Sequence, residues 1–429
     1  MSLRVVVTGV GVVSPFGVGL EAFRAGILGG VSTSRPIRTF DAVGLPTSFG
    51  CEVPADFDPT AFVPRAKMVK TMSRAVQYGT AAAKMAWDEA AIRDVEPTDI
   101  GVVAGVGGVG SWDLEDTAEI AGVAALQVRR SGGADPFEPK AWVKMALERL
   151  NPIMPLRCLP NMAAAHIAIV LGAKGESNSI ATSCTSSTQA IGEAYRLIRS
   201  GAARVVIAGG CDAAVNPSAL AGFGALGVLS KRSHDPAHAS RPFDRDRDGF
   251  VLGEGSAFLV VERRDDAIRR GAHIRAEIAG YASTNDAYRL TDEDPEGRGS
   301  ATAIHRALAD AGVESSQVDY VNAHGTGTRM NDATESRIVA RIFGPRVAIS
   351  ATKSMIGHSL AAAGALEVTA CLMAIESQKA PPTINLDNVD PECAVHHVAN
   401  HAEGLPINVV VKNSFGFGGQ NACLVLKKP

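Results

Sequence analysis

The cysteine at position 184 lies at the junction of two sequence patterns. A β-rich run, Asn178–Cys184, precedes an amphipathic helical pattern at Thr188–Ser200. The junction predicts a sulfur at a helix N-terminus, where backbone N–H groups and the helix dipole favour the thiolate. The dipole contributes only about 0.3–1 kcal/mol, and one pKa unit is worth about 1.36 kcal/mol. A strong nucleophile therefore needs a further partner such as a histidine, and a buried structural cysteine is the alternative.

A histidine ends a second predicted strand and enters a glycine- and threonine-rich loop, VDYVNAHGTGT. His324 is the histidine, and Thr326 and Thr328 place two hydroxyls beside it. Asp332 and Glu335 follow at the start of the next predicted helix, where carboxylates cap free N–H groups. These four neighbours predict a loop with a fixed backbone, and a structural role for His324 is the alternative to catalysis.

A third segment, ISATKSMIGHSLAAAGALE, combines a lysine, a histidine and a glutamate. Lys353 lies at a strand end among small residues, which is unusual for a solvated lysine. His358 precedes an apolar helix, and Glu367 interrupts the apolar pattern of that helix. We therefore expect Glu367 to be a buried partner of a basic group, with helix capping as the alternative role of His358.

The motif NSFGFGGQN near the C-terminus interleaves aromatic residues with glycine. Phe415 and Phe417 alternate with Gly416 and Gly418, so the segment is too flexible for a core strand. Apolar rings on a mobile loop suit a gate over an acyl chain. A tight structural turn is the alternative.

The bulk composition excludes several classes of protein. The 429 residues are 46% hydrophobic and 20% charged, with a net charge of −3, which favours a globular protein and not a nucleic-acid binder. The N-terminus lacks the features of a signal peptide, and no uninterrupted apolar run is long enough for a membrane span. Seven cysteines without a CxxC motif predict neither disulfides nor a metal site. We expect a reduced, cytoplasmic protein.

Short β-branched runs alternate with Ala-rich helical patterns along the whole chain, which predicts an α/β fold. In two places a strand ends at a potentially reactive residue and a helix begins just after it. This similarity suggests an internal duplication with halves at 1–265 and 266–429. The clearest helical patterns are Val76–Ala90, Thr188–Ser200, Gly299–Ala311 and Leu360–Gln378.

The motifs together resemble the β-ketoacyl-acyl carrier protein synthases of the elongating KAS II type. The matching segments are ATSCTSS, RPFDRDRDGFVLGEG, NAHGTGT, TKSMIGH and NSFGFGGQN, in the order of the family. The resemblance covers essentially the whole chain. It implies a thiolase-like fold, in which two duplicated βαβ-rich halves form a five-layered αβαβα arrangement, and a dimer.

The resemblance also implies a decarboxylative Claisen condensation that yields a 3-oxoacyl carrier protein. Cys184 takes the acyl group, and backbone N–H groups of Cys184 and Phe417 stabilise the oxyanion. Malonyl-carrier then loses CO₂, and His324 and His358 donate hydrogen bonds to the enolate. Lys353 orders the histidines and Glu367 holds Lys353. The enzyme itself binds no cofactor and no metal.

The carrier protein supplies phosphopantetheine, and the resemblance assigns several residues to its binding. Thr326 and Thr328 are expected to bind its amides, with Thr291 as a weaker candidate. Because such carriers are acidic, a local basic patch is expected. Lys67, Lys70 and Arg74 match the docking region of the family, and an ordinary solvated helix face is the alternative.

Several departures from the family pattern point to a specialised role in polyketide, polyene or unusual fatty acid synthesis. Ser187 replaces a usual glycine, and Arg289 lies in DAYRLT, where many elongation enzymes read DAYHMT, before an acidic segment DEDPEG. Arg329 replaces a frequent proline. Gly108 aligns near a bulky residue at the floor of the acyl pocket, which predicts a roomier pocket. The segment 129–160 is longer than usual, is predicted to be partly helical, and lies near the dimer interface of the family.

Three alternatives compete with an elongating synthase that forms a homodimer. The first is a ketosynthase of a type II polyketide or polyene system, paired with a catalytically silent, chain-length-factor-like subunit. The second is a degradative thiolase, which needs another cysteine near the C-terminus; Cys393 and Cys423 lie outside the NSFGFGGQN motif. The third is a non-catalytic subunit, which the presence of Cys184, His324 and Lys353 disfavours.

Overall fold

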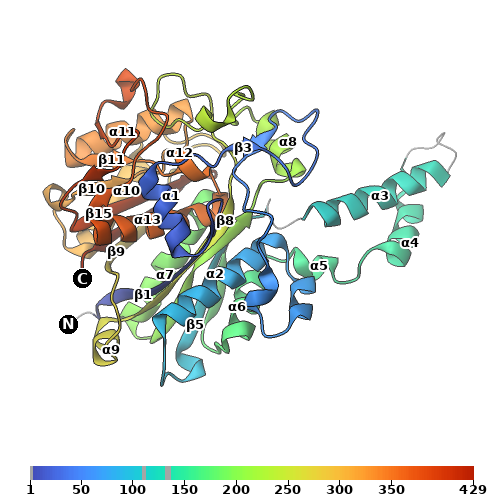
Figure 1. Ribbon diagram of the computed structural model, residues 1–429, viewed down its shortest axis with the longest axis horizontal. Coiled ribbons are helices and arrows are strands. Elements are labelled where there is room, and N and C mark those ends of the chain that lie inside the picture. Colours follow the sequence, from blue (N-terminus) through green and yellow to red (C-terminus); the bar gives the residue numbers. More distant parts are fainter. Residues whose placement is uncertain (1–2, 109–112, 131–136) are drawn as a thin grey trace.

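The N-terminal half of the chain builds one side of a large mixed sheet. The computed structural model describes residues 3–108, 113–130 and 137–429 (Figure 1). The strands pair in the order β6 (Ser177–Ile180), β5 (Ile100–Val106), β7 (Val205–Ala213), β8 (Glu254–Arg263) and β1 (Val5–Ser14). β5 runs parallel to β6 and β7, and β8 runs antiparallel to β7 and β1.

The C-terminal half repeats this order, and β9 joins the two parts by pairing with β1. β10 runs parallel to β11 and β15, and β16 runs antiparallel to β15 and β9. The predicted duplication is therefore present in the topology, whereas the boundary at residue 265 stays a prediction. The strands pair in the order β11 (Ala348–Ser350), β10 (Tyr320–Asn322), β15 (Val409–Gly416), β16 (Gln420–Lys427) and β9 (Ala276–Asn285).

Helices form three layers around the two halves of the sheet. Successive side chains along each strand point alternately to the outer face of the sheet and to the inner face, which meets the middle layer of helices. Outward residues such as Val102 pack against α2 (Arg74–Ala90) and α6 (Met162–Leu171). On the other outer face, Val411 packs with α10 (Arg298–Ala311) and α11 (Arg329–Phe343). Inward residues of both halves pack on α7 and α13. The five-layered arrangement predicted from the resemblance is confirmed.

The middle layer consists of α7 (Ser186–Ser200) and α13 (Ala363–Ser377). Every residue of α13 from Ala363 to Ile375 is buried, which explains why this helix is apolar on all sides. The stretch Leu360–Ser377 has the length and hydropathy of a membrane span, but 89% of it is buried inside the fold. It is the core helix of the molecule.

Two glycines of the first strand allow close packing of α2. A side chain on Gly9 or Gly11 would overlap the backbone oxygens of Ala86 or Ala82. The GVGVV segment is therefore a helix-packing site, which agrees with the absence of a nucleotide-binding pattern after it. The Ala-rich face of α2 is therefore buried against β1.

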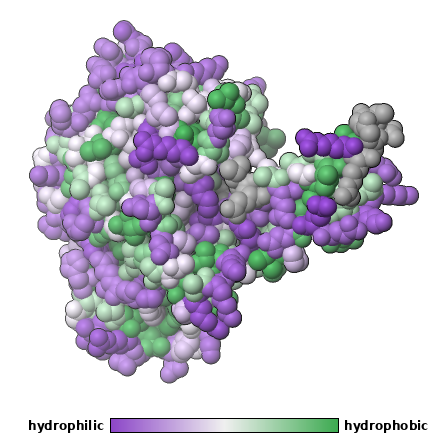
Figure 2. Space-filling model, turned by 45° about the vertical axis from the view of Figure 1, so that its right-hand side comes forward, coloured by the Kyte–Doolittle hydropathy of each residue, from purple (hydrophilic) through white to green (hydrophobic). Residues whose placement is uncertain are grey.

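An arm extends from the body after β5 (Figure 1). It consists of α3 (Leu114–Arg130), α4 (Pro139–Arg149) and the short α5 (Met154–Arg157). Figure 2 shows apolar side chains along the arm, and Leu147 on α4 is 84% exposed. The segment 129–160 is thus partly helical, as predicted, although its residues 131–136 lie outside the described part of the chain.

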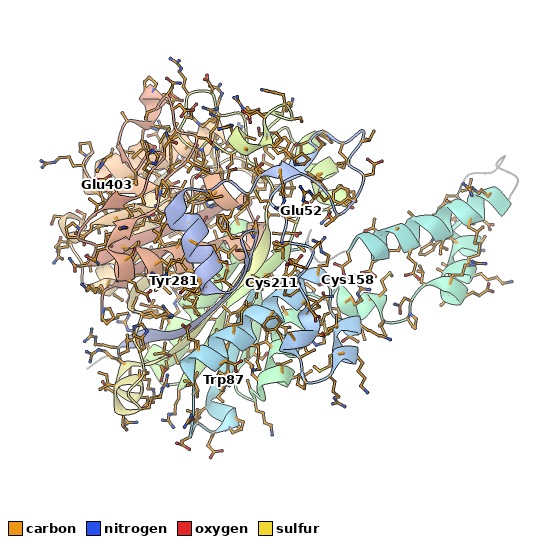
Figure 3. The ribbon with its side chains drawn as sticks, in the orientation of Figure 1. Glu52, Trp87, Cys158, Cys211, Tyr281 and Glu403 are labelled. Carbon is orange, nitrogen blue, oxygen red and sulfur yellow. The ribbon has the colours of Figure 1, made fainter. Side chains whose placement is uncertain are left out.

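The predicted helices match the observed ones to within two or three residues, apart from the N-terminal end of the fourth, whose first turn, Leu360–Ala362, is a 3₁₀ turn before α13. All seven cysteines are free, including Cys158 where the arm joins the body and the buried Cys211 (Figure 3). The prediction of no disulfide is consistent with this arrangement.

Candidate active site

Cys184 lies in a strained turn directly before α7. The turn is a 3₁₀ segment, Ser183–Thr185, in which Ser183 has a φ of 57°. A non-glycine residue in this left-handed conformation costs about 1–2 kcal/mol. The Ser186 hydroxyl stabilises the turn because it donates to the Ser183 carbonyl (2.7 Å) and accepts from the Thr182 N–H (2.9 Å). The turn places a buried sulfur at the helix start, where the sequence predicts it.

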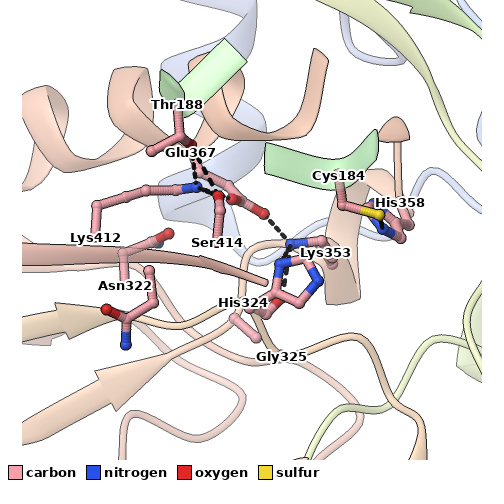
Figure 4. A network of polar contacts seen from close by, with 12 residues as sticks. Cys184, Thr188, Asn322, His324, Gly325, Lys353, His358, Glu367, Lys412 and Ser414 are labelled. Carbon is pink, nitrogen blue, oxygen red and sulfur yellow. Dashed lines mark hydrogen bonds and ion pairs between the residues drawn. The ribbon is translucent and has the colours of Figure 1, made fainter. Parts of the chain in front are cut away.

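Two histidines from the C-terminal half lie beside this sulfur (Figure 4). The Nε2 atom of His358 is 3.1 Å from the Sγ atom of Cys184. The rings of His324 and His358 meet edge to face, with centroids 5.4 Å apart. Residues separated by more than 130 positions in the sequence thus share one buried site.

The hydrogen bonds of the histidines determine which nitrogen carries the proton. The Lys353 ammonium can only donate, and its Nζ is 3.2 Å from Nδ1 of His324. The N–H of Leu360 donates to Nδ1 of His358 at 3.3 Å. Both Nδ1 atoms therefore accept, so both neutral rings carry their proton on Nε2. The pair is arranged to donate hydrogen bonds.

This tautomer assignment also bears on metal binding. Among the described residues, Cys184, His324 and His358 form the one group of such ligands close enough for a metal ion, with ligand atoms within 4.8 Å. A metal ligand must offer a lone pair. Nε2 atoms that carry protons, next to a lysine ammonium, suit an anionic substrate oxygen better than a cation.

Lys353 and Glu367 form a buried ion pair behind the histidines. Lys353 begins α12 (Lys353–Ile356), and its ammonium also donates to the His324 carbonyl at 2.6 Å. The two residues are 1% exposed. Lys353 is therefore fixed between a carboxylate and His324, in the arrangement that the resemblance implies.

The loop that carries His324 is held by two buried carboxylates. The N–H groups of His324 and Gly325 each donate to Glu335 at 2.9 Å. Asp332 accepts from the N–H of Gly327 at 3.1 Å and of Phe243 at 2.8 Å. These bonds go beyond the helix capping considered from the sequence, because they fix the backbone of the histidine itself.

The polar segment RPFDRDRDG, predicted as a loop, supplies a buried ionic support for the same region. Arg247 is 1% exposed and lies 2.6 Å from Asp390 and 3.4 Å from Asp332. It also donates to the backbone oxygens of Thr328 and Arg329. The alternating charges of this loop thus stabilise the active-site loops from behind, which the sequence pattern alone did not reveal.

A pocket of about 160 Å³ opens above Cys184. Its wall contains Thr291, Thr326 and Thr328, and the hydroxyls of the last two are 2.9 Å apart. Among the described residues, Gly108 is not part of this wall; it is exposed, and an added Cβ would have no described neighbour within 4 Å. The role of Gly108 in an acyl tunnel stays a prediction.

The glycine- and phenylalanine-rich motif forms another wall of the pocket. Phe415 is buried with its ring 5.9 Å from that of His324, and Phe417 lies over the site beside Phe223. The N–H of Phe417 faces the Cys184 sulfur and lowers the pKa of the thiol. The N–H of Gly418 donates to the Leu290 carbonyl at 2.7 Å. Most of the motif belongs to the paired strands β15 and β16, with only Phe417–Gly419 between them, so the expectation that it is too flexible for a core strand is wrong. The motif joins the end of β15 to the loop that carries Thr291.

Burial is the main influence on the acidity of Cys184. It raises the pKa of the thiol, although Ser183, Lys353 and the Phe417 N–H each lower it. Burial thus opposes the stabilisation of the thiolate that is expected at a helix N-terminus. Burial likewise lowers the pKa of His324 and His358 well below 6.5, and the Lys353 ammonium adds to both shifts. Both rings are neutral at physiological pH.

Ser187, which replaces a usual glycine, connects the two central helices. Its hydroxyl accepts from the N–H of Ala365 at 2.9 Å. A side chain on Gly105, Gly210 or Gly364 would overlap the Ser187 and Thr188 region. The serine therefore fits because its glycine neighbours leave room, and it binds α7 to α13.

The three predicted docking residues lie in different surroundings. Lys67 and Lys70 are exposed on the 3₁₀ turn Ala66–Thr71. Arg74, at the start of α2, lies 2.7 Å from the buried carboxylate of Glu254 and 3.0 Å from the Tyr78 hydroxyl. The two lysines thus remain available at the surface, whereas the guanidinium of Arg74 is largely occupied inside the protein.

Two further groups near the site were missed in the sequence. Lys412, in the middle of the strand run VVVKNS, is completely buried and contacts Glu367. A lysine within an apolar strand was the available signal. Glu293 lines the pocket, where burial raises its pKa to about 8, and its Oε2 has no hydrogen-bond partner within the described part of the chain. The acidic motif DEDPEG does not by itself predict a position for this side chain.

Comparison with known proteins identifies the family to which the chain belongs. The β-ketoacyl synthase N-terminal domain profile matches residues 2–267, and the C-terminal domain profile matches residues 275–387. The chain belongs to the β-ketoacyl synthase family. The predicted family and the predicted class of enzyme, an acyltransferase of the ketosynthase type, are confirmed.

Relatives named as 3-oxoacyl-[acyl-carrier-protein] synthases and relatives named as polyketide ketoacyl synthases both align with nearly the full length of the chain. The 3-oxoacyl-[acyl-carrier-protein] synthase 2 of Synechocystis sp. is 42% identical over 430 residues, which cover 99% of this chain and 98% of the relative. The tetracenomycin polyketide synthase ketoacyl synthase alpha subunit of Streptomyces glaucescens is 39% identical over 433 residues, covering 99% and 97%. The solved ishigamide ketosynthase/chain length factor has a TM-score of 0.86 and 36% identity over 100% of both chains.

Proposed function

We propose that this β-ketoacyl synthase condenses a Cys184-bound acyl group with malonyl-acyl carrier protein to give a 3-oxoacyl carrier protein. The observation that carries the proposal is the buried cluster in which Cys184 Sγ lies 3.1 Å from His358 Nε2, with His324 beside it. A nucleophile and two hydrogen-bond donors meet in one pocket, which is the set that acyl transfer and enolate formation need.

The first step is transfer of the acyl group to Cys184. The sulfur attacks the thioester carbonyl, and the carrier thiol leaves with the proton that Cys184 gives up. The His358 Nε2–H donates to the sulfur, which favours the thiolate despite its burial. The N–H groups of Cys184 and Phe417 bind the oxyanion of the tetrahedral intermediate. The strained turn at Ser183 presents the sulfur for attack.

The second step is decarboxylation of the malonyl group, followed by carbon–carbon bond formation. The C–C bond to the carboxylate breaks, CO₂ leaves, and its electron pair becomes an enolate whose oxygen accepts from the Nε2–H groups of His324 and His358. The enolate carbon then attacks the acyl-cysteine and expels the Cys184 thiolate. Lys353, held by Glu367, keeps the His324 proton on Nε2 throughout.

Phosphopantetheine arrives on the carrier protein. The pocket wall formed by Thr326, Thr328 and Thr291 provides hydroxyls for its two amides. The exposed Lys67 and Lys70 provide the positive charge that an acidic carrier needs. Arg74 contributes less to docking than first expected because Glu254 neutralises it.

The chain functions as a dimer in this proposal. The arm exposes apolar side chains, including Val143 and Leu147 of α4, that a single chain leaves in water. β6 is the edge strand of the sheet and is available to pair with another chain. A second copy or a homologous chain-length-factor-like subunit can serve as the partner, and the solved ishigamide ketosynthase/chain length factor provides the precedent for the second. A cytoplasmic location stays a prediction.

A polyketide role is the specific alternative to fatty acid elongation. It is favoured by the similarity to a type II polyketide ketosynthase that was solved in complex with its acyl-carrier protein and bound to the hexaketide, at 33% identity and a TM-score of 0.86. The two roles share the same chemistry and differ in the chain that occupies Cys184.

Intact-mass measurement with acyl-carrier proteins of graded chain length tests the proposal. We expect an acyl adduct on the wild-type protein and on Cys158→Ala, a matched variant of another free cysteine, but not on Cys184→Ala. The preferred acyl group separates the fatty acid role from the polyketide role. Absence of an adduct from every donor, also with a chain-length-factor-like subunit supplied, would contradict the proposal.

A further inference from the structure

A second lysine is buried behind the active site. Lys412 lies on β15 and is completely inaccessible to solvent. Its Nζ is 2.8 Å from Oε2 of Glu367 and donates to the Thr188 hydroxyl at 2.9 Å, and it also contacts the Ser414 hydroxyl. Figure 4 shows its side chain reaching Glu367 from the side opposite Lys353. None of the chemical steps above uses it.

The carboxylate of Glu367 is therefore shared by two ammonium groups. Lys353 lies at Oε1 and Lys412 at Oε2. Burial lowers the pKa of Lys412, whereas the Glu367 carboxylate raises it and favours the ammonium form, in which the three buried side chains carry one net positive charge. Burying an ion that is not fully compensated is expensive, and a neutral side chain at position 412 avoids that cost. A buried second lysine is therefore expected only where its positive charge contributes to the function of the active site.

The positive charge acts on the histidine pair. Burial is the main reason that the pKa values of His324 and His358 are low, and both Lys353 and Lys412 lower them further. The other charged or titratable groups around the pair come from five further elements or loops of the molecule. These are Cys184, Asp212, Glu293, Glu335 and Glu367.

We propose that Lys412 is a positioning residue, which holds Glu367 from behind and keeps His324 and His358 neutral, with their Nε2 protons directed at the substrate. The inference rests on the proposed function, because it assigns the histidines to enolate stabilisation. Lys412 acts by its contact with Glu367 and by its electrostatic effect on the two histidines, and it does not touch the reacting atoms.

Two consequences follow from the geometry. Without Lys412, Glu367 loses its second partner and Lys353 is less firmly held against Nδ1 of His324. The histidines also lose a nearby positive charge, so their pKa values rise and they become protonated at a higher pH. A protonated Nδ1 can no longer accept the hydrogen bond that orients the ring.

The test compares the pH dependence of malonyl-carrier decarboxylation in the wild-type protein and in Lys412→Met. Methionine keeps the length of the side chain and removes the charge. We expect the acid limb of the rate profile to move to higher pH by about one unit, which is the size expected for one nearby charge at a buried site. The rate is then reduced by up to about 10-fold at pH values below the acid limb of the wild type, and much less at pH 8.

A double variant separates charge from packing. Lys412→Met with Glu367→Gln has the same net charge as the wild type, because one positive and one negative group are removed together. We expect its acid limb to return towards the wild-type position, although its rate stays low because Lys353 has lost its partner. If Lys412→Met does not fold, Lys412→Gln provides a second neutral variant that retains a donor for Thr188.

The outcomes distinguish this inference from the proposed function. A rate reduced by the same factor at every pH, with an unmoved acid limb in both neutral variants, would show that Lys412 only fills space and would overturn the inference. A wild-type protein that neither decarboxylates malonyl-carrier nor forms the Cys184 adduct would overturn the proposed function itself.

Discussion

The two halves of the molecule present the same backbone junction with different chemistry. In the N-terminal half β6 leads into α7, and Cys184 lies at that junction. In the C-terminal half β11 leads into α13, and the equivalent junction carries Lys353 and His358. Because α7 and α13 pack against each other in the middle layer, the two junctions face one pocket.

The two junctions are held in place by different forces. A left-handed Ser183 and local hydroxyl bonds position the sulfur. On the other side, buried charge does the positioning, because Lys353 is fixed between Glu367 and His324. The duplicated fold thus supplies a common geometry, while one half provides the nucleophile and the other provides the hydrogen-bond donors. The following substitutions test this division.

The largest effect is expected for His324→Ala. Removal of one donor from an anion-binding site reduces the rate about 10²- to 10³-fold, so decarboxylation of malonyl-carrier should fall by this factor. Formation of the acyl adduct on Cys184 should change only a few-fold, because the turn at Ser183 is intact. Rate and adduct measurements on the same preparation check this, with the exposed His305→Ala as the control. Equal loss of both steps would contradict the division.

A smaller effect is expected for Glu335→Gln. One amide oxygen replaces a carboxylate that accepts from the N–H groups of both His324 and Gly325. An unsatisfied buried donor costs about 1–3 kcal/mol, so the melting temperature should fall and decarboxylation should decrease about 10-fold. Alkylation of Cys184 by iodoacetamide should continue at close to the wild-type rate. A variant with unchanged decarboxylation would show that Glu335 does not position His324.

The smallest effect concerns stability and pH. The folded protein keeps His324 and His358 neutral, with pKa values well below 6.5, whereas the unfolded chain binds protons there as pH falls below about 6.5. The free energy of unfolding should therefore decrease with falling pH in that range, by up to about 1.4 kcal/mol per pH unit for each histidine. Denaturation at pH 7.5 and 5.5 measures this slope.

The matched variant for this measurement is His358→Gln, whose slope should be shallower than that of the wild type. Acidic residues titrate in the same range but contribute equally to both proteins. Identical slopes in the two proteins would mean that His358 is not held neutral in the folded state.

Much of the site could be predicted from the sequence because its residues follow strand ends. Cys184, His324 and Lys353 each end a β-branched run and precede a helix, so the α/β topology brings them to one edge. Their partners Glu335 and Glu367 were recognisable as carboxylates at a helix start and within an apolar helix. The fold class and the duplication were predicted from the same alternation of strands and helices.

The remaining features depend on distances that a sequence does not contain. The partner of Arg74 is Glu254, which is 180 positions away in the chain. The raised pKa of Cys184 depends on burial among residues that are distant in the chain, such as Leu220, Phe250 and Leu360. Lys412 belongs to the site only because β15 passes behind α13. In each case tertiary packing, and not the local motif, determines what the side chain does.

The most direct test of the account is the activity of Cys184→Ala towards malonyl-carrier protein alone. We expect this variant to form no acyl adduct and no condensation product, and still to release CO₂, because the Nε2–H groups of His324 and His358 do not depend on the sulfur. Loss of CO₂ release together with acyl transfer, in a variant that melts like the wild type, would contradict the assignment of the two steps to the two halves.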